Sequence, residues 1–451
     1  MSTLITGGTV YLDGGPEQTD VLVANEHIAA IGHSLHAPTA DVIHAEGLAV
    51  LPGMIDFHVH MDDVIGGVLL ADSYRSGSHV AVLTGITTLI GFVTQNAGHS
   101  LHTDVQAASD KVNGKSFCDV GFHLTPTRFA EEDWHDMENL IERGFHTFKF
   151  YTTYKDAGLY QSYENLHAIF TRLNALGARF LVHCEDEDVL QHAQRAVMDT
   201  SKAASHALRR PPEAEVKAIA CIVALAEETK TKVHIVHVST AEGTQIVRRA
   251  ARRAEVTCET APHYLFLNDE LLAARNGHRF ICAPPLRSET NRTQMEELAA
   301  GEAFDFFASD HCAFMRADKD AQKSDIRKIP GGIPGVGTLV PLMHELLCRK
   351  RGKTLDELRI RLSRNPAQLA GLYPRKGAIQ VGSDADLVLL SENGSPRPIR
   401  ASLSDVWDPY AGRTTTLDVR HVFLRGHHVV CENELLNADH ALGRCVIPDP
   451  A

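Results

Sequence analysis

Two histidines, two positions apart, form the pattern in this sequence that best fits metal chemistry. His58 and His60 close the segment PGMIDFHVH, which begins at Pro52. Because side chains alternate along a strand, both imidazoles would point to the same side of the chain. Two such imidazoles can hold a divalent cation such as zinc. Taken alone, the pair fits two unrelated histidines as well.

Further polar residues follow apolar, strand-like runs. Lys149 lies within TFKFY, His183 ends FLVH, His237 follows VHIV, and Asp310 follows FDFFAS. Burying an ammonium group costs free energy, so Lys149 needs a partner or a changed charge state. A surface salt bridge is the alternative for this lysine. His234, in the same run as His237, is interpreted as strand packing because it lacks the strand-end position.

The segments that carry these residues alternate with helix-like segments over about 320 residues, which is typical of a parallel (β/α)8 barrel. Strands are expected at Ile55–His60, Thr87–Phe92, Asp119–Leu124, Thr147–Tyr151, Arg179–His183, Val233–Val238, Val256–Thr260 and Phe304–Ser309. Helices are expected at Glu131–Arg143, Tyr163–Leu176, Pro212–Thr229 and Ala241–Arg253. The polar residues fall at the C-terminal ends of the first, fourth, fifth, sixth and eighth strands, the barrel face that carries catalytic groups. A doubly wound open sheet is the alternative architecture.

Short strand-like runs with tight turns occupy both ends of the chain. We expect residues 1–52 and 378–451 to form the two parts of a small β-sandwich domain, the second part including a C-terminal tail. Residues 53–377 would form the metal-dependent barrel. The predicted fold is therefore α/β, a distorted (β/α)8 TIM-like barrel with a small β-sandwich domain built from both chain ends.

Composition narrows the partners and the compartment. The chain has 451 residues, and 57 acidic against 44 basic residues give a net charge of −13. This balance disfavours nucleic acid and anionic membrane surfaces as partners. The nine cysteines show no CxxC pairing, and no apolar run is long enough to span a bilayer. With no secretory pattern in the first ten residues, we expect a cytoplasmic protein.

An ordered set of segments resembles the dihydropyrimidinase and hydantoinase branch of the amidohydrolase superfamily over nearly the whole chain. The segments are PGMIDFHVH, HTFKFYTTYKDAG, FLVHCED, VHIVHVSTAEG, ETAPHYLFL, ICAPPLR, FASDHCAF, KIPGGIPGVGTLVPLM and NPAQLAGLYPRKGAIQVGSDADLVLL. The resemblance implies a binuclear metal-dependent hydrolase of cyclic amides. It also implies a homo-oligomer, with a tetramer expected.

The resemblance assigns a role to each polar residue at the strand ends. His58 and His60 would bind the more buried metal ion, and His183 and His237 the second, with zinc expected for both. Lys149 would react with CO2 to give an N6-carboxylysine, an anionic oxygen ligand that bridges the two ions. This modification would also remove the cost of burying an ammonium.

Two residues would carry the proton and the developing charge. Asp310 would complete the shell of the first ion and move a proton from the attacking water to the departing ring nitrogen. Tyr154, five residues after Lys149, matches the family tyrosine that stabilises the oxyanion. The two ions would lower the pKa of a bridging water and so supply the attacking hydroxide.

The substrate pocket is the least determined part of the resemblance. Ile65 and Tyr151 are expected beside the ring substituent, and Tyr154, Ala283 and Gly331 around the ring. Three positions depart from the family pattern. Ala283 stands where a serine often precedes Pro-Pro, Gly331 replaces an asparagine, and Gly337 replaces an acidic residue. A hydantoin, a dihydropyrimidine or a similar cyclic imide or ureide is the expected substrate.

Two other enzymes and one non-enzyme remain as alternatives. An allantoinase-like or dihydroorotase-like activity would use the same metal ligands. Dihydroorotase usually has an arginine after HxH to bind the substrate carboxylate, whereas Asp62 and Asp63 stand in that segment here. A catalytically silent dihydropyrimidinase-like scaffold is the third alternative, but such scaffolds lack several metal ligands and this chain has all six.

Overall fold

Eight parallel strands form the central sheet of the molecule, and their order in space follows their order in the sequence. A computed structural model of the chain describes residues 2–448. The strands are β6 (Met54–Asp56), β10 (Ile86–Thr94), β11 (Asp119–Thr125), β12 (Thr147–Tyr151), β13 (Arg179–His183), β14 (Lys232–Ile235), β15 (Val256–Thr260) and β16 (Phe306–Phe307). This succession is typical of a (β/α)8 barrel.

A short pair of strands brings the first and last units of the barrel together. The strands β7 (Val59–His60) and β17 (His311–Cys312) pair in parallel, with Cys312 opposite His60. Each lies just after one of the two end strands of the sheet, β6 and β16. The eight strands therefore curl into a nearly closed barrel rather than a doubly wound open sheet, and the predicted fold class is confirmed.

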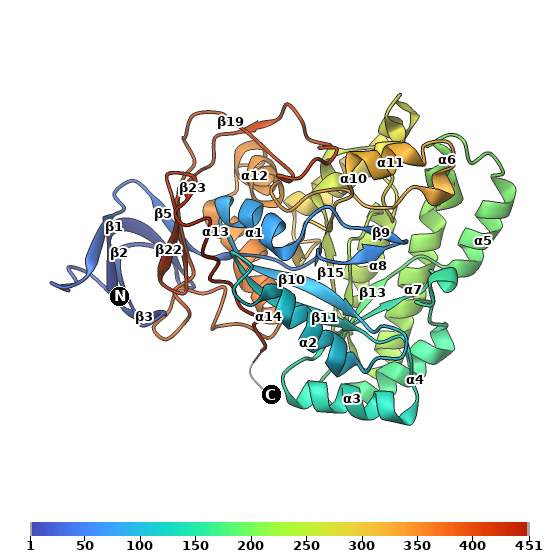
Figure 1. Cartoon of the computed structure of the whole chain (residues 1–451), viewed down its shortest axis with the longest axis horizontal. Helices are drawn as coiled ribbons and strands as arrows, with labels where there is room; N and C mark the ends of the chain where they lie inside the picture. Colours follow the sequence, from blue (N-terminus) through green and yellow to red (C-terminus); the bar gives the residue numbers. More distant parts are fainter. Residues whose placement is uncertain (1, 449–451) are drawn as a thin grey trace.

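Helices pack around the outside of the barrel (Figure 1). Several begin at a Ser, Thr or Asp cap, which satisfies a free backbone N–H; the Ser162 hydroxyl, for example, accepts from the Asn165 amide at 3.1 Å. The helices are α1 (Tyr74–Leu83), α2 (Leu101–Val112), α3 (Glu131–Glu142), α4 (Tyr163–Asn174), α5 (Glu187–Ala196), α6 (Ser205–Arg209), α7 (Pro212–Thr229), α8 (Ala241–Ala250), α9 (Pro262–Phe266), α10 (Glu289–Ala300), α11 (Arg316–Ala321), α12 (Leu339–His344), α13 (Leu355–Arg359) and α14 (Asn365–Leu369).

Three of the predicted strands are shorter than expected, and all three lie beside polar residues at the barrel mouth. The predicted strand Ile55–His60 is interrupted between β6 and β7, the sixth strand ends at Ile235, and the eighth contains only Phe306–Phe307. His237 and Asp310 have φ values of +38° and +49°. A residue with positive φ leaves the extended conformation, so the chain turns away from the ladder at these points.

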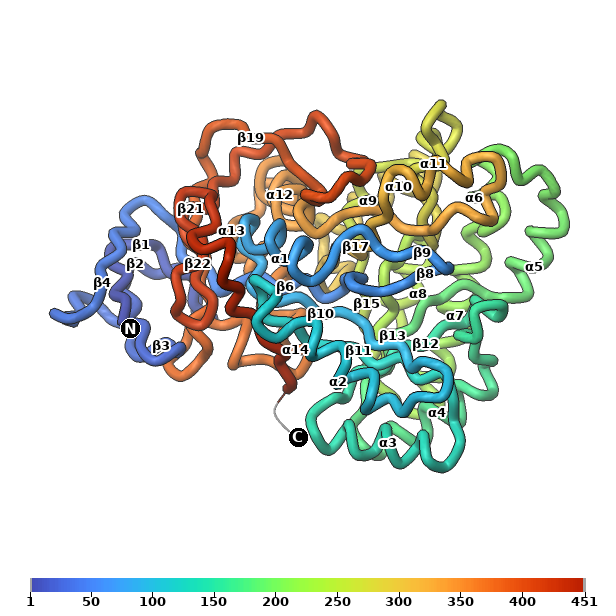
Figure 2. Tube along the Cα trace, viewed as in Figure 1, coloured from blue at the N-terminus to red at the C-terminus, as the bar shows by residue number. Residues whose placement is uncertain are grey.

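A second sheet combines both ends of the chain, as expected from the sequence (Figures 1 and 2). Its nine strands are β1 (Ser2–Leu12), β2 (Gly15–Ala24), β3 (His27–Gly32), β4 (Asp41–His44), β5 (Ala49–Pro52), β18 (Leu387–Ser391), β21 (Asp418–Leu424), β22 (His427–Cys431) and β23 (Glu434–Leu435). Strand β5 links the two halves, because it pairs in parallel with β1 and antiparallel with β18. Residues from both halves, including Val10, Val23, Leu387 and Phe423, share one buried apolar cluster.

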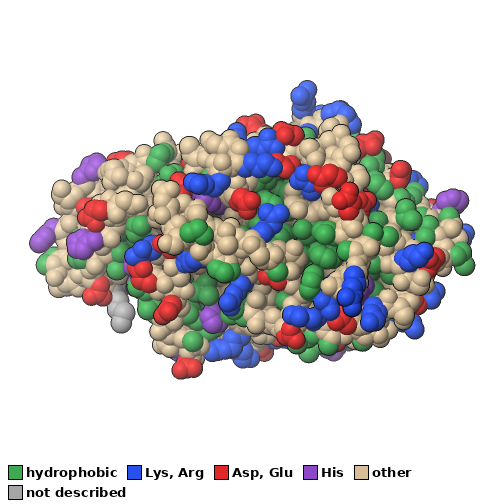
Figure 3. Space-filling model, turned by 90° about the horizontal axis from the view of Figure 1, so that it is seen from above, with side chains coloured by type: hydrophobic (Ala, Val, Ile, Leu, Met, Phe, Trp, Pro, Cys, Tyr) green, Lys and Arg blue, Asp and Glu red, His purple; other side chains and the backbone are tan. Residues whose placement is uncertain are grey.

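The segment after β23 returns to the barrel. Cys445 forms a bridge with Val120 of β11, and Val446 is buried against the barrel. On the face seen in Figure 3, Lys and Arg side chains are interspersed with Asp and Glu. Among residues 2–448, none of the helices combines the length and the apolar character needed to cross a membrane.

Candidate metal centre

Three predicted ligands meet at the mouth of the barrel, where its first and last units join. The Nε2 atoms of His58 and His60 lie 3.3 Å apart. Asp310 Oδ1 lies 3.3 Å from Nε2 of His58 and 3.8 Å from Nε2 of His60. The three side chains therefore point at one small volume, which has the donor types and the size of a metal site.

A second pair of imidazoles lies beside the first. His183 ends β13 and His237 follows β14, and Nδ1 of His183 lies 3.1 Å from Nε2 of His237. The rings of His58 and His237 have their centroids 5.3 Å apart. The two pairs thus occupy neighbouring positions at the same end of the barrel.

Lys149 lies close to both pairs of histidines. It is 1% exposed in β12, and its Nζ lies 5.3 Å and 5.2 Å from the ring centroids of Phe92 and Tyr151. Burial lowers the pKa of Lys149 to about 7, and the carboxylates of Glu259 and Asp310 oppose this change. The Lys149 ammonium in turn contributes, after burial, to the lowered pKa of all four histidines.

Buried carboxylates orient one ring in each pair. Nδ1 of His58 donates to Oε1 of Glu259, and Nε2 of His183 donates to Oε2 of Glu185, each over 2.7 Å. These bonds place the ring proton of His58 and of His183 on the side away from the other histidine of the pair, so Nε2 of His58 and Nδ1 of His183 keep a lone pair. Each of these two nitrogens can therefore bind a cation.

The protonation state of the histidine rings suits metal binding. Burial lowers the pKa of His60 to about 3 and that of His183 to about 4, so both rings are neutral near pH 7. Burial also raises the pKa of Asp310, and the nearby Lys149 ammonium counteracts it. Neutral imidazoles and a carboxylate are the ligands that zinc and related divalent ions prefer, so the residues present fit such ions.

Tyr154 stands beside the second pair in an unusual backbone conformation. Its φ is +67°, and its ring centroid lies 5.1 Å from that of His183. Nη2 of Arg210 lies 3.3 Å from its hydroxyl oxygen. Burial raises the pKa of Tyr154 above its usual range, whereas the Arg210 guanidinium lowers it, so the hydroxyl stays protonated and can donate. With His237 and Asp310, three predicted site residues have positive φ, a strained conformation that clusters at functional sites.

The predicted pocket residues fall into two groups. The ring of Tyr151 lies 5.8 Å from that of Tyr154, centroid to centroid. Ile65 lies in the hairpin of β8 (Val64–Ile65) and β9 (Val68–Leu69) and packs against a small apolar cluster that contains Cys312. Both therefore lie near the barrel mouth.

The other two predicted pocket residues, Ala283 and Gly331, lie on neighbouring loops. The Gly331 carbonyl lies 3.9 Å from Sγ of Cys312, and the Gly332 amide donates to the carbonyl of Ile281, two residues before Ala283. A Cβ at Gly331 would meet nothing within 4 Å.

Close packing explains why position 337 is a glycine rather than an acidic residue. A Cβ there would lie 2.2 Å from the carbonyl oxygen of Arg400 and 2.3 Å from Cγ1 of Val80. An acidic side chain has no room at this position, so the departure from the family pattern reflects close packing against residues 80 and 400.

Sequence reasoning missed three charged residues of the site. Glu185 stands two positions after His183 in FLVHCED, and Glu259 is a carboxylate inside the buried strand β15, so both had a sequence signal. Arg210 had none, because it lies just after α6, in a segment whose packing the sequence pattern does not define.

Comparisons with known proteins agree with this geometry. Residues 49–429 match the amidohydrolase family. A D-hydantoinase of Geobacillus stearothermophilus is 31% identical over 97% of this chain and 94% of its own length. A dihydropyrimidinase of Arabidopsis thaliana is 30% identical over 99% of this chain and 85% of its own length. The crystal structure of a dihydropyrimidinase from Brevibacillus agri superposes with a TM-score of 0.93 at 31% identity, covering 99% of this chain and 98% of that one.

The extent of these matches and the grouping of metal-binding side chains at the barrel mouth lead to one assignment. The chain belongs to the amidohydrolase family, in its dihydropyrimidinase and hydantoinase branch, and is a metal-dependent hydrolase of a cyclic amide bond.

Proposed function

We propose that the chain opens a hydantoin, a dihydropyrimidine or a closely similar cyclic imide at a centre that holds two divalent metal ions. The family implies use of a divalent metal. The proposal adds that both ions are zinc and that Lys149 is an N6-carboxylysine. The observation that carries it is the presence of two pairs of facing imidazole nitrogens, at 3.3 Å and 3.1 Å, close to the buried Lys149.

We assign each ligand as follows. One ion would be held by His58, His60 and Asp310, and the other by His183 and His237, with the carboxylated Lys149 between them. Bound ions of this kind lower the pKa of water and polarise a carbonyl oxygen.

The side chains around the ions complete the reaction. Asp310 takes a proton from the attacking water and returns it to the ring nitrogen as the C–N bond breaks. The Tyr154 hydroxyl donates to the carbonyl oxygen as negative charge develops on it. Arg210 holds this hydroxyl in place.

The charges around the mouth favour a neutral ring over an anionic one. Arg210 is paired with the buried carboxylate of Glu185, its Nε lying 3.1 Å from Oε1, so its charge is already balanced. Asp62 and Asp63 flank the mouth in the segment after β7, where a dihydroorotase-like enzyme would need a cation. Dihydroorotate, a carboxylate, is therefore a poorer fit than hydantoin or dihydrouracil.

A substrate panel tests this proposal. Purified enzyme supplied with zinc and bicarbonate is assayed with hydantoin, dihydrouracil, dihydroorotate, allantoin and succinimide. We expect the neutral hydantoin or dihydrouracil ring to give the highest kcat/KM. A preference for dihydroorotate or allantoin would reassign the substrate, and no ring opening with full metal occupancy would favour the silent scaffold.

We also propose features beyond the site. Residues 1–52 and 378–451 would supply one β-rich domain together with a C-terminal tail, and residues 53–377 the barrel, which the shared nine-stranded sheet supports. A homotetramer in the cytoplasm that binds neither nucleic acid nor membrane follows from the family resemblance and the acidic charge balance. Size-exclusion chromatography with light scattering tests the assembly.

A further inference from the structure

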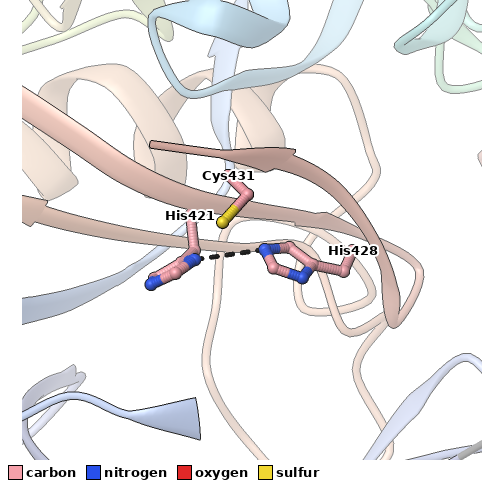
Figure 4. A group of neighbouring side chains, drawn as sticks. All are labelled: His421, His428 and Cys431. Carbon is pink, nitrogen blue, oxygen red and sulfur yellow. Dashed lines mark hydrogen bonds between the residues drawn. The ribbon is translucent and has the colours of Figure 1, made fainter. Parts of the chain in front are cut away.

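A second group of metal-binding side chain types lies outside the barrel, in the nine-stranded sheet. His421 lies on β21, and His428 and Cys431 lie on the neighbouring strand β22. Figure 4 shows the three side chains pointing toward one another. One donor atom from each lies within 4.8 Å of the other two. We refer to these three residues as the hairpin cluster.

A β-bulge brings the hairpin cluster to one face of the sheet. His421 and Cys431 are direct cross-strand partners, so their side chains share a face. His428 stands three positions before Cys431 and would point to the opposite face of a regular strand. The register shifts in this hairpin by one extra residue on β22, Val429, which turns His428 to the face of the other two.

The face that carries the cluster continues into an apolar core. His421 pairs in register with Leu389 of β18, a member of the buried cluster of this sheet. The ring of His428 stacks on buried Phe423, with centroids 4.6 Å apart and planes at 15°. Burial lowers the pKa of His421 and of His428.

A hydrogen bond alone explains only part of this arrangement. Nδ1 of His421 lies 3.1 Å from Nε2 of His428, which fits one shared proton. It leaves the Cys431 thiol unexplained, since within residues 2–448 no hydrogen bond involves its sulfur. Two imidazoles and a thiol are a donor set typical of zinc sites.

We propose that His421, His428 and Cys431 bind one divalent cation of the zinc class, with water in the fourth position. Donor atoms on a tetrahedron with bonds of about 2.0–2.3 Å lie about 3.3–3.8 Å apart, so small side-chain rotations close the observed cluster around an ion. On binding, the Cys431 thiol would release its proton to solvent, and each ring would bind through a nitrogen lone pair. The ion would tie β21 to β22 across the bulge.

A third group of potential ligands in the same region already has its cation. Asp119, Asp384 and Asp386 surround Nζ of Lys376, which lies 2.8, 3.0 and 2.7 Å from a carboxylate oxygen of each. Their negative charge is thus balanced by an ammonium inside the group. Within residues 2–448, no such cation occupies the hairpin cluster: it holds no Lys or Arg side chain, and this distinguishes it from the aspartate group.

The test compares bound metal in full-length enzyme and in variants of the cluster. Wild type, Cys431→Ser and His428→Gln are dialysed against buffered free zinc, and bound zinc is measured by elemental analysis. We expect each variant to bind one ion fewer per chain, with kcat for ring opening unchanged. His427→Gln, altered one residue away on the opposite face of β22, is the matched control and should bind as much zinc as wild type.

Cobalt gives a readout that does not depend on the variants. The proposed barrel ligands contain no sulfur, so a thiolate-to-cobalt charge-transfer band that is present in cobalt-loaded wild type and lost in Cys431→Ser reports the hairpin cluster. We expect this band in wild type and in His427→Gln, and its loss in Cys431→Ser. Its absence from wild type, or equal zinc content in all four proteins, would overturn the hairpin site and leave the barrel centre untouched.

Discussion

Nη2 of Arg210 lies 3.3 Å from the hydroxyl oxygen of Tyr154, and the same guanidinium is paired with the buried carboxylate of Glu185. Its Cζ lies 5.2 Å from the centroid of the Tyr154 ring. Arg210 thus links the proposed oxyanion donor to the carboxylate that orients His183. This relationship makes Arg210 a positioning residue, because it contacts Tyr154 and Glu185.

We expect Arg210→Lys to lower kcat by about 10–100-fold and to change KM by less than about threefold, because lysine lacks the planar fork that pairs with both Glu185 oxygens and reaches Tyr154. Steady-state kinetics with the best substrate of the panel measure the effect. Arg209→Lys is the control, since Arg209 donates to the carbonyls of Gln194 and Val197 instead.

A double-mutant cycle separates positioning from a general loss of packing. Tyr154→Phe alone should lower kcat by about 10²–10³-fold, as expected for the loss of one oxyanion donor. If Arg210 acts through the hydroxyl, Arg210→Lys costs little more in the Tyr154→Phe background. Full additivity of the two effects would contradict the positioning role.

Lys149 should be essential for metal binding as well as for turnover. We expect Lys149→Arg to lower kcat/KM by roughly 10³-fold or more, because arginine cannot become a carbamate ligand and the metals supply several kcal/mol of transition-state stabilisation. Metal content should fall in parallel. Lys155→Arg, an exposed lysine six residues later, is the control and should behave as wild type.

Isotope labelling tests the modification itself. Enzyme reconstituted with zinc and ¹³C-bicarbonate should show a carbamate carbon signal by NMR in wild type and in Lys155→Arg, but not in Lys149→Arg. An active wild-type enzyme without this signal would show that Lys149 acts as a free amine.

Glu259 should affect metal affinity more than the chemical step. Because it accepts from Nδ1 of His58 over 2.7 Å, we expect Glu259→Gln to weaken metal binding by about 10–100-fold. Activity should recover at high free zinc, which distinguishes this effect from a loss of catalytic groups. The control is Glu255→Gln, because Glu255 is exposed and lies just before β15; it should leave the zinc dependence of activity unchanged. A Glu259→Gln enzyme that stays inactive at saturating zinc would indicate a direct catalytic role.

The sequence predicts the barrel well where strands are regular. Strands β12, β13 and β15 begin and end at the predicted residues, because each is a short run of mainly apolar or β-branched residues between helical segments. The predicted first strand is wrong in detail, because the chain leaves the ladder between β6 and β7. The rule of alternating side chains therefore does not by itself explain why His58 and His60 meet.

The parts of the site that escaped prediction depend on contacts between distant segments. Glu259 and His58 are separated by 201 positions, and Arg210 and Tyr154 by 56. No local pattern encodes such pairs, because they arise only when the barrel brings the strand ends together. The close packing that excludes a side chain at Gly337 is of the same kind.

An ion-pair cluster on α10 should make stability depend on pH in the acid range. Glu296 is largely buried and accepts from Arg292 at 2.9 Å and Arg351 at 2.8 Å. Burial raises its pKa, but hydrogen bonds from Lys350, Arg292 and Arg351 outweigh burial and lower the pKa to about 2. A lowered folded-state pKa stabilises the native state above the ordinary glutamate value of 4.5, and this stabilisation is lost as the pH falls from there toward 2. We expect Glu296→Gln to lower the free energy of unfolding by about 2 kcal/mol at pH 7, with a smaller difference from wild type at pH 3.

The matched control is Glu297→Gln, because the side chain of Glu297 is 62% exposed; it should change the free energy of unfolding by less than about 0.5 kcal/mol at either pH. Urea unfolding at the two pH values measures both variants, and an equal loss at pH 7 and pH 3 for Glu296→Gln would show that its charge is not responsible.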